Sequence, residues 1–392
     1  MNEGKATRYH RLRRRTSLLV ALGGLACGVT LLASGIAVGL RDVVRDAGTS
    51  LGLSGVGLDL GTAAVYAAAL CGVVEVGMIP ARFFQGYLLE RRYRQSRVAA
   101  ARWGLAQGVT ALLEIGVVAA AAVGVTLCVR VWGDLWWVGC AVVFSGVTLA
   151  TTNLAPVWVI PRLGRVRPLD RPSLSARLTA LAARVGVPAL RVEELAAGGH
   201  ARRPQASLVG LGATRRILLS DALLRDFSDD EIEAVAAHEL AHHVHRDLWQ
   251  LVAFEFAVAL AALWSGQWAV TVLGARLGLG GPGDPASLPL LALTAGMVVT
   301  LASPLGHALS RHQERRADRF ALRHTGNATA FRASLRRLAG QHLAEERPSR
   351  LVELLWHSHP PLHRRLASVA AFETSTSSSR AGPRPCRAAP SG

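Results

Sequence analysis

Two histidines and one glutamate stand close enough in the sequence to share one chemical task. His238 and His242 are four residues apart, and Glu239 follows the first of them, in the order His-Glu-Leu-Ala-His. On an α-helix, residues at this spacing lie on one face, so the two imidazoles can bind one metal ion. In the H-E-x-x-H pattern two neutral imidazoles bind zinc, and the glutamate acts as general base on a water. The spacing therefore predicts a hydrolytic zinc centre.

These residues need a helix, and the sequence supplies a start for one. Ser228 is followed three residues later by Glu231, which is the spacing of a capping box. Asp229 and Asp230 lie at the positive end of the helix dipole. We therefore expect a helix that begins here and carries both histidines.

A catalytic zinc with one open position needs a third protein ligand, commonly a carboxylate from a later helix. Glu314 and Asp318 are four residues apart within an arginine-rich segment. Glu314 is the candidate ligand, and Asp318 would then reach a ligand imidazole from the same helix face. The alternative is a solvated helix whose carboxylates pair with its arginines.

A third candidate stands near the C-terminus, where His359 precedes Pro360 and Pro361. Prolines at the start of a helix fix φ where no amide donor is required, so they would hold His359 rigidly. A histidine held in this way can donate a hydrogen bond to the oxyanion of a tetrahedral intermediate. The alternative is a surface histidine next to a helix start.

The elements that position these residues belong to a largely apolar chain. Of 392 residues, 51% are hydrophobic and only 18% are charged. Since about 20 apolar residues cross a bilayer, the composition predicts a polytopic, mainly α-helical membrane protein with about six transmembrane helices. The apolar runs are residues 18–40, 61–84, 104–129, 135–160, 248–273 and 287–309.

Arginine-rich segments before the first run, between the second and third, and after the fourth predict that these segments are cytoplasmic. The last two runs form a hairpin that returns the chain to the side of His238, so Glu314 can share its metal. The predicted domains are a membrane region at 1–160, peptidase parts at 161–246 and 310–373, a transmembrane hairpin at 247–309, and a disordered tail at 374–392.

The segment before the histidine helix has the composition of a soluble domain with a small β-sheet. Residues 173–185 have helical apolar spacing, and residues 188–194 alternate like a strand. Residues 205–211 and 216–219 indicate a hairpin. A strand beside the metal would receive an extended peptide by main-chain pairing. The alternative is a hairpin with a purely structural role.

The net charge of +17 raises the question of nucleic acid. The arginines gather at the boundaries of the apolar runs, which favours membrane topology and anionic lipid headgroups. We therefore expect the bilayer as a partner and no nucleic acid.

The chain resembles a known family at four motifs. These are His238-Glu-Leu-Ala-His242, Glu314-Arg-Arg-Ala-Asp318, the segment from Gly212 to Leu224, and His359-Pro-Pro-Leu362. They are similar to those of the integral-membrane zinc peptidases that comprise the type I CAAX prenyl endopeptidases and the HtpX heat-shock proteases. The likeness extends into the membrane part at Glu90-Arg-Arg-Tyr-Arg-Gln-Ser96.

The resemblance implies a gluzincin-type fold with one Zn²⁺ per chain, bound by His238, His242 and Glu314. It implies Glu239 as the catalytic base, Asp318 as a supporting or proton-handling acid, and His359 as a stabiliser of the transition state. Four predicted crossings before the zinc helix favour the CAAX branch, since HtpX-like members have two. Where the family has Asn-Ala at its substrate strand, this chain has Gln205-Ala206.

The sequence thus predicts a zinc endopeptidase of the plasma membrane, with its active site facing the cytoplasm. Its substrates would be membrane proteins or lipid-anchored peptides. One alternative is a catalytically silent scaffold or sensor that keeps the fold, which the intact Glu239 argues against. Another is a zinc transporter or sensor, which would need metal-binding side chains within the membrane runs.

Overall fold

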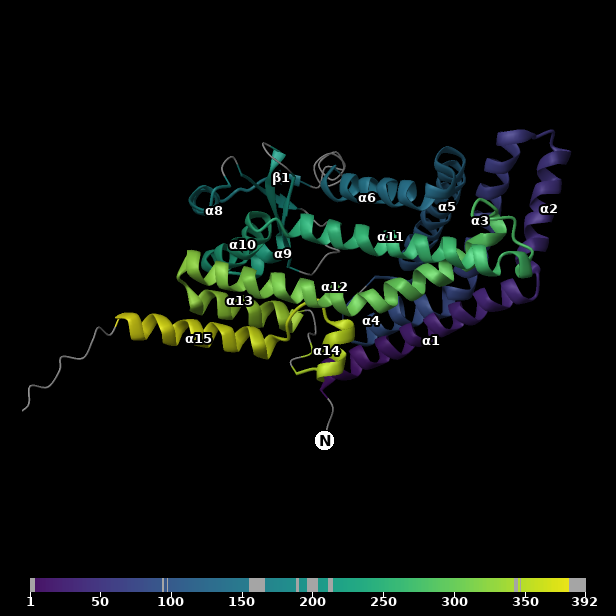
Figure 1. Cartoon of the computed structure of the whole chain (residues 1–392). Helices are drawn as coiled ribbons and strands as arrows, with labels where there is room; N and C mark the ends of the chain where they lie inside the picture. Colours follow the sequence, from purple (N-terminus) through teal and green to yellow (C-terminus); the bar gives the residue numbers. More distant parts are fainter. Residues whose placement is uncertain are drawn as a thin grey trace, which may run out of the picture. The chain divides into compact units, whose positions relative to one another are not determined.

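The computed structural model describes nearly all of the chain, and Figure 1 traces it from the N-terminus to the C-terminal helix. The described residues are 4–93, 95–96, 98–154, 166–187, 190–195, 204–210, 214–341, 345 and 347–380. The chain divides into two compact units, each built from two stretches of sequence. One comprises residues 1–149 and 251–304, and the other residues 150–250 and 305–392. The predicted domain boundaries alternate in the same order and stay a prediction.

Long apolar helices make up the first unit. Among the described residues, five helical segments are long and apolar enough to cross a membrane: Lys5–Ala33, Gly55–Arg92, Ala100–Thr152, Asp247–Leu277 and Pro285–Thr325. The third segment has 53 residues and holds two helices, α5 (Ala100–Trp132) and α6 (Trp136–Leu154), joined by a short 3₁₀ turn. One crossing takes about 20 residues, so the third segment is long enough for two crossings. The expectation of about six transmembrane helices therefore agrees approximately with these segments.

The hydropathy of the first apolar run suggested one continuous helix, but the structure has two. Helix α1 (Lys5–Ala33) ends before Gly35, and a separate helix α2 (Ile36–Ser50) follows. Gly35 has a φ of 75°, a left-handed conformation that glycine adopts without steric cost and that ends a helix. The third helix, α3 (Gly55–Arg82), continues through a π-helical segment, Phe83–Leu89, into α4 (Glu90–Arg92).

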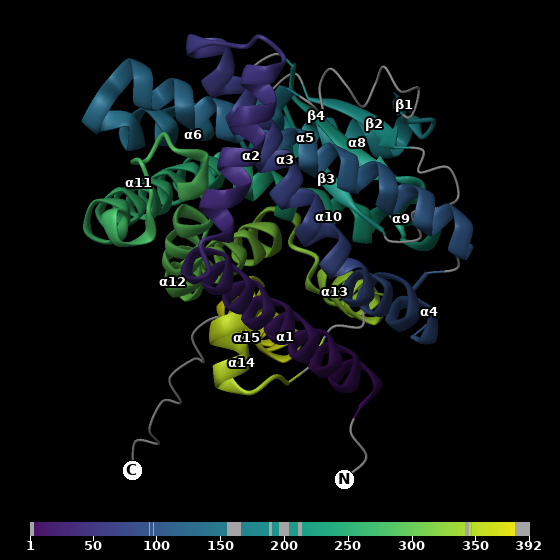
Figure 2. The ribbon, with the colours of Figure 1, turned by 90° about the vertical axis from the view of Figure 1, so that its right-hand side faces the viewer.

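A four-stranded mixed sheet lies in the second unit, with strand order β1-β2-β4-β3 (Figure 2). The strands are β1 (Val166–Pro168), β2 (Arg191–Leu195), β3 (Ala206–Val209) and β4 (Arg216–Ser220). Strands β3 and β4 pair antiparallel, so the predicted hairpin is confirmed. Strand β3 is at the edge of the sheet. Among the described residues no strand pairs with its outer side, so that side could pair with a further strand.

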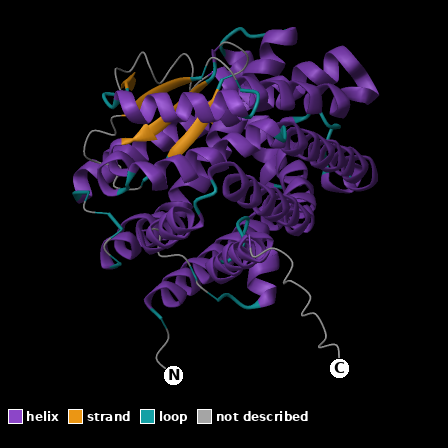
Figure 3. Cartoon of the chain, turned by 90° about the vertical axis from the view of Figure 1, so that its left-hand side faces the viewer, coloured by secondary structure: helices purple, strands orange, loops and turns teal. Residues whose placement is uncertain are grey.

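Helices cover the sheet, which Figure 3 shows as a small orange patch among them. Helix α8 (Pro172–Arg184) presents Leu174, Leu178 and Leu181, all fully buried, to the same core as Ile217 and Leu219 of β4. Full burial of a leucine or isoleucine side chain stabilises the folded state by about 1.5–3 kcal/mol. The leucines of α8, spaced four and three residues apart, and the buried residues of β4, spaced two apart, therefore form the base on which the helices of the site rest.

The remaining helices of this unit follow the sheet along the chain. They are α9 (Asp221–Asp226), α10 (Asp229–Val244), the start of α11 (Asp247–Leu273), the end of α12 (Leu288–Thr325), α13 (Ala328–Gln341), α14 (Arg350–Trp356) and α15 (Leu362–Arg380). Helix α15 extends into the segment expected to be disordered. Phe372 packs on the core, and hydroxyls such as that of Thr374 bond to preceding carbonyls, so the helix continues to Arg380. Residues 381–392 lie outside the described part.

Candidate metal centre

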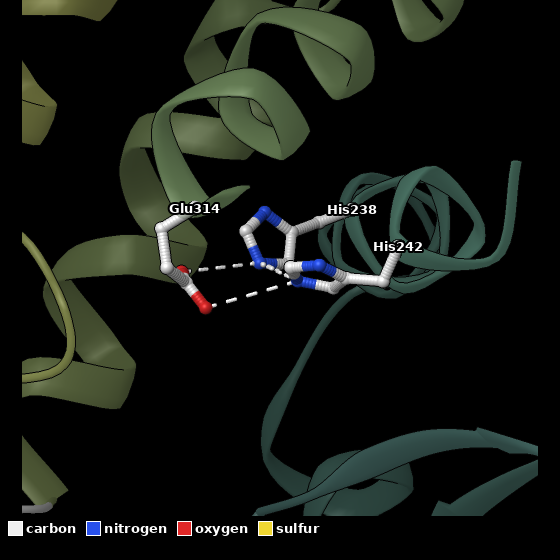
Figure 4. A group of neighbouring side chains, drawn as sticks. All are labelled: His238, His242 and Glu314. Atoms are coloured by element: carbon white, nitrogen blue, oxygen red, sulfur yellow. Dashed lines mark hydrogen bonds and ion pairs between the residues drawn. The ribbon is translucent and has the colours of Figure 1, made fainter. Parts of the chain in front are cut away.

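Three of the predicted site residues come together in space (Figure 4). His238 and His242 project from α10, and Glu314 faces them from α12. The Nε2 atoms of the two histidines are 3.3 Å apart. Oε2 of Glu314 lies 3.4 Å from Nε2 of His238, and Oε1 lies 3.7 Å from Nε2 of His242. The three side chains thus converge on one point.

These separations fit a zinc ion. Ligand atoms about 2.1 Å from a tetrahedral centre stand about 3.4 Å from one another, and the three observed distances lie near this value. A group of two imidazoles and one carboxylate is also a common ligand set of catalytic zinc. The described residues therefore fit the metal that the sequence predicts.

Helix α10 is fixed by its cap and by its buried face. The capping box is present, since Ser228 N donates to Oε2 of Glu231 at 2.8 Å and Glu231 N donates to Oγ of Ser228 at 3.3 Å. Ile232, Ala236 and Leu240 are fully buried. An anchored first turn and a buried face leave the helix little freedom to rotate, so its two histidines keep their direction.

His238 is held from behind by a buried ion pair. Its Nδ1 atom lies 3.0 Å from Oδ1 of Asp318, whose side chain is only 3% exposed. Arg365 donates to both oxygens of Asp318, from Nε at 2.8 Å and from Nη2 at 2.5 Å. A carboxylate on Nδ1 leaves Nε2 free to bind metal. The two hydrogen bonds from Arg365 favour the supporting role of Asp318 over the proton-handling one.

His242 has a corresponding partner. Its Nδ1 atom lies 2.8 Å from Oδ2 of Asp247, the first residue of α11. Asp247 is 5% exposed, and Arg316 donates to its other oxygen. Each imidazole is therefore oriented by a carboxylate that an arginine holds in turn.

Glu239 stands in the site with a free carboxylate. Its side chain has no hydrogen-bond or ion-pair partner within the described part of the chain. Burial raises the pKa of Glu239, against the opposing effect of His238 and His242. A carboxyl with a raised pKa and free oxygens has the properties of a general base, because it accepts a proton more readily than an exposed one.

The structure also brings His359 to this group. Its Nδ1 atom lies 2.9 Å from Oε1 of Glu314, while 66% of the side chain remains exposed. The segment that carries it is fixed by Arg311, which donates to the carbonyl oxygens of Glu353 and His357 at 2.9 and 2.6 Å. His359 therefore lies at the rim of the metal centre, open to solvent on its other side.

The electrostatic state of His238 follows from its neighbours. Burial lowers the pKa of His238, but its contacts with Asp318 and Glu314 outweigh burial and raise it to about 10. In the metal-free protein this imidazole is therefore protonated at neutral pH. The carboxylates of Glu314 and Asp318 therefore favour a positive charge at this site, as a metal-binding site requires.

Sequence reasoning missed Asp247, Arg365 and Arg316. Asp247 is five residues beyond His242 and Arg365 follows the His359 motif, but nothing in their spacing marks them as partners of a histidine. His245 is seven residues after His238 and would lie on the same helix face one turn beyond His242. Its ring instead packs edge-on against Phe320, with centroids 5.5 Å apart, and it is not part of the metal-binding group.

Comparisons with known proteins agree with this geometry. The family model described as "Peptidase family M48" matches residues 168–373. The model described as "CAAX prenyl protease N-terminal, five membrane helices" matches residues 4–165. The two matches together span both units.

Individual relatives show the same likeness. The chain is 27% identical over 292 residues to the uncharacterised metalloprotease YhfN of Bacillus subtilis, which covers 72% of this chain and 67% of the relative. It is 27% identical over 178 residues to the CAAX prenyl protease 1 homolog of Dictyostelium discoideum, covering 44% of this chain and 41% of that one. The chain thus aligns with less than half of the second relative.

A solved structure has the same fold. The crystal structure of Ste24p from S. mikatae matches with a TM-score of 0.76 and 19% identity, over 93% of this chain and 87% of that chain. The prediction of the fold class is therefore confirmed. Because one family model covers more than half of the chain and reaches every residue of the metal centre, the chain belongs to peptidase family M48 and is a membrane metallopeptidase.

Proposed function

We propose that this metallopeptidase is a zinc-dependent endopeptidase that cleaves membrane proteins or lipid-anchored peptides at the cytoplasmic surface of the plasma membrane. One observation carries the proposal. The Nε2 atoms of His238 and His242 and the carboxylate oxygens of Glu314 are 3.3–3.7 Å apart, which is close to the separation of ligand atoms around a tetrahedral zinc ion. His238, His242 and Glu314 would hold one zinc ion. When bound, zinc would polarise the scissile carbonyl and lower the pKa of a water.

The chain's own residues have distinct tasks in this reaction. Glu239 takes the proton from the attacking water and passes it to the leaving amine. Its raised pKa and free oxygens support this role. His359 donates a hydrogen bond to the oxyanion, as its exposed ring at the rim allows. Asp318 and Asp247 hold the two imidazoles in the tautomer with Nε2 directed at the metal.

The edge strand β3 would hold the substrate. It packs beside α10, and its outer backbone groups are open within the described sheet. An extended peptide can add to such an edge by main-chain hydrogen bonds, which suit an endopeptidase because they do not depend on side-chain identity. The substrate backbone would then cross next to the two histidines.

The cytoplasmic orientation rests on charge. Arginines gather before the first apolar helix and around residues 90–97, and basic segments of this kind remain in the cytoplasm. The CAAX prenyl protease names of the relatives suggest lipidated substrates. A single cysteine at Asp230 in a cysteine-free variant should resist a membrane-impermeant maleimide on intact cells, whereas one at Gly281 should react.

The experiment that tests the proposal uses the full-length protein in detergent. We would measure zinc content and the cleavage of a farnesylated peptide and of an unmodified membrane-protein reporter. Glu239→Gln should keep stoichiometric zinc and lose on the order of 10²–10⁴-fold in kcat. His238→Ala should lose zinc, whereas His312→Ala, an exposed histidine near Glu314, should keep zinc and activity.

Each other outcome has a definite meaning. Zinc-loaded wild-type protein that cuts neither reporter would support the silent scaffold. A protein that binds no zinc would refute the ligand assignment. Cleavage of the unmodified reporter alone would remove the lipid anchor from the definition of the substrate.

A further inference from the structure

A cavity lies next to the metal centre, on the side of His242. Its volume is about 300 Å³. It is formed by the end of α10, the turn into α11, the segment after α8, and the residue before β4. His242 and Arg215 line it together with His243, Arg246 and Trp249. Because His242 belongs to both, the cavity and the metal centre share one wall.

The cavity is cationic. Two arginines, Arg215 and Arg246, line it, and none of its described lining residues is an aspartate or a glutamate. Asp247 is adjacent in sequence, but its carboxylate is buried and already bonded to His242 and Arg316. Nothing that lines the described cavity neutralises the two guanidinium groups.

Among the described residues Arg215 has no ion-pair partner, whereas its neighbour in the sequence has one. Arg216 donates to Oε2 of Glu193 at 3.1 Å. The Nε atom of Arg215 is buried without a hydrogen bond, and its side chain has no ion pair with any described residue. A half-buried cation with no anion among the described residues around it carries an uncompensated desolvation cost. An anionic ligand in the cavity would remove that cost.

Arg246 occupies a backbone position that suits glycine. Its φ is 57°, and it is the sole non-glycine residue with a positive φ in the described chain. A left-handed conformation is unfavourable for arginine. The side chain at this position also has no ion-pair partner among the described residues. A charge kept here at a conformational cost is consistent with a role in binding.

We propose that this cavity binds a carboxylate of the peptide substrate and so contributes to substrate selection. The inference rests on the proposed peptidase function. One arginine guanidinium can recognise a carboxylate through two parallel hydrogen bonds, and a second arginine adds a further positive charge. A cavity of about 300 Å³ has room for a side chain or a chain end rather than a peptide. The shared wall at His242 places that carboxylate close to the scissile bond.

The carboxylate has two possible sources, an acidic side chain and the C-terminus of the substrate. The test is a set of fluorogenic peptides of one sequence in three forms: with a free C-terminus, with a C-terminal amide, and as an amide that carries one glutamate at successive positions. We would measure kcat/KM for wild type, Arg215→Gln, Arg246→Gly and the double variant. Arg246→Gly also relieves the backbone conformation, so misfolding would not explain a loss.

The expected result is a preference of the wild type, at least tenfold in kcat/KM, for one carboxylate form over the plain amide. The form preferred identifies the source of the carboxylate. Each variant should reduce the preference to less than twofold and leave cleavage of the plain amide and zinc content unchanged. Arg225→Gln, an exposed arginine of α9, serves as the matched control and should behave like wild type.

Equal cleavage of all forms by wild type, or an equal loss on all forms in the variants, would overturn the proposal. Stimulation by phosphatidylglycerol vesicles that both variants abolish, with no effect of peptide charge, would assign the cavity to a lipid phosphate instead. If wild type cuts no peptide, the proposed function fails. The cavity is then tested by anisotropy of labelled peptides on the Glu239→Gln variant, where weaker binding of the amide supports it and equal binding refutes it.

Discussion

The Nδ1 atom of His242 lies 2.8 Å from Oδ2 of Asp247, and Asp247 is the first residue of α11. Helix α11 begins one of the segments that are long and apolar enough to cross a membrane. The orientation of one candidate metal ligand is therefore fixed by the residue at which a membrane-spanning segment starts.

Asp247→Asn should weaken zinc binding about 10–100-fold without unfolding the protein, because the amide no longer fixes the tautomer of His242. Competition with a fluorescent zinc chelator gives the affinity, and circular dichroism checks the fold. Asp226→Asn is the control, since the described ion pair of the Asp226 carboxylate is with the exposed Arg225. Unchanged affinity in Asp247→Asn would show that Asp247 does not orient a ligand.

Zinc binding to the metal-free protein should release at least one proton at pH 7. The pKa of His238 is raised to about 10, so its imidazole is charged before zinc binds and must be neutral afterwards. Calorimetry in buffers of different ionisation enthalpy measures the proton count. Between about pH 7 and 9 the zinc affinity should rise about tenfold per pH unit for each proton released. A binding enthalpy that is independent of buffer would contradict this expectation.

The same shift has a consequence for stability. Because the folded-state pKa of His238 lies above its ordinary value of 6.5, the stabilising contribution of its charged form is complete below pH 6.5. It is lost as the pH rises toward 10. The melting temperature of the metal-free protein should decline over this range, and zinc should remove the decline.

Arg365→Leu should destabilise the protein by about 3–5 kcal/mol, because it leaves Asp318 buried without its cation. The double variant Arg365→Leu with Asp318→Leu should recover much of that loss but should still bind zinc weakly, since His238 loses its carboxylate. Denaturant unfolding of the metal-free protein and a zinc titration separate the two effects. The control is Arg225→Ala, which removes an exposed ion pair with Asp226 and should change the free energy of unfolding by no more than about 0.5 kcal/mol.

Sequence alone determined the features that depend on local geometry. The spacing of His238 and His242 fixes their common face because an α-helix repeats every 3.6 residues. Ser228 and Glu231 fix its first turn, and runs of about 20 apolar residues fix the membrane class. Glu314 could be predicted because a catalytic zinc commonly takes a carboxylate as its third ligand, and Glu314 and Asp318 follow the histidines at helical spacing.

Tertiary structure decided the rest, because its contacts join residues that no period relates. Arg365 meets Asp318 across 47 residues, and Arg316 meets Asp247 across 69. Arg215 and Arg246 are unremarkable in a chain of net charge +17, and only packing shows that they face one cavity without a carboxylate. Helical periodicity specifies what one element can present, whereas the partner that meets it depends on how the whole domain buries its apolar surface.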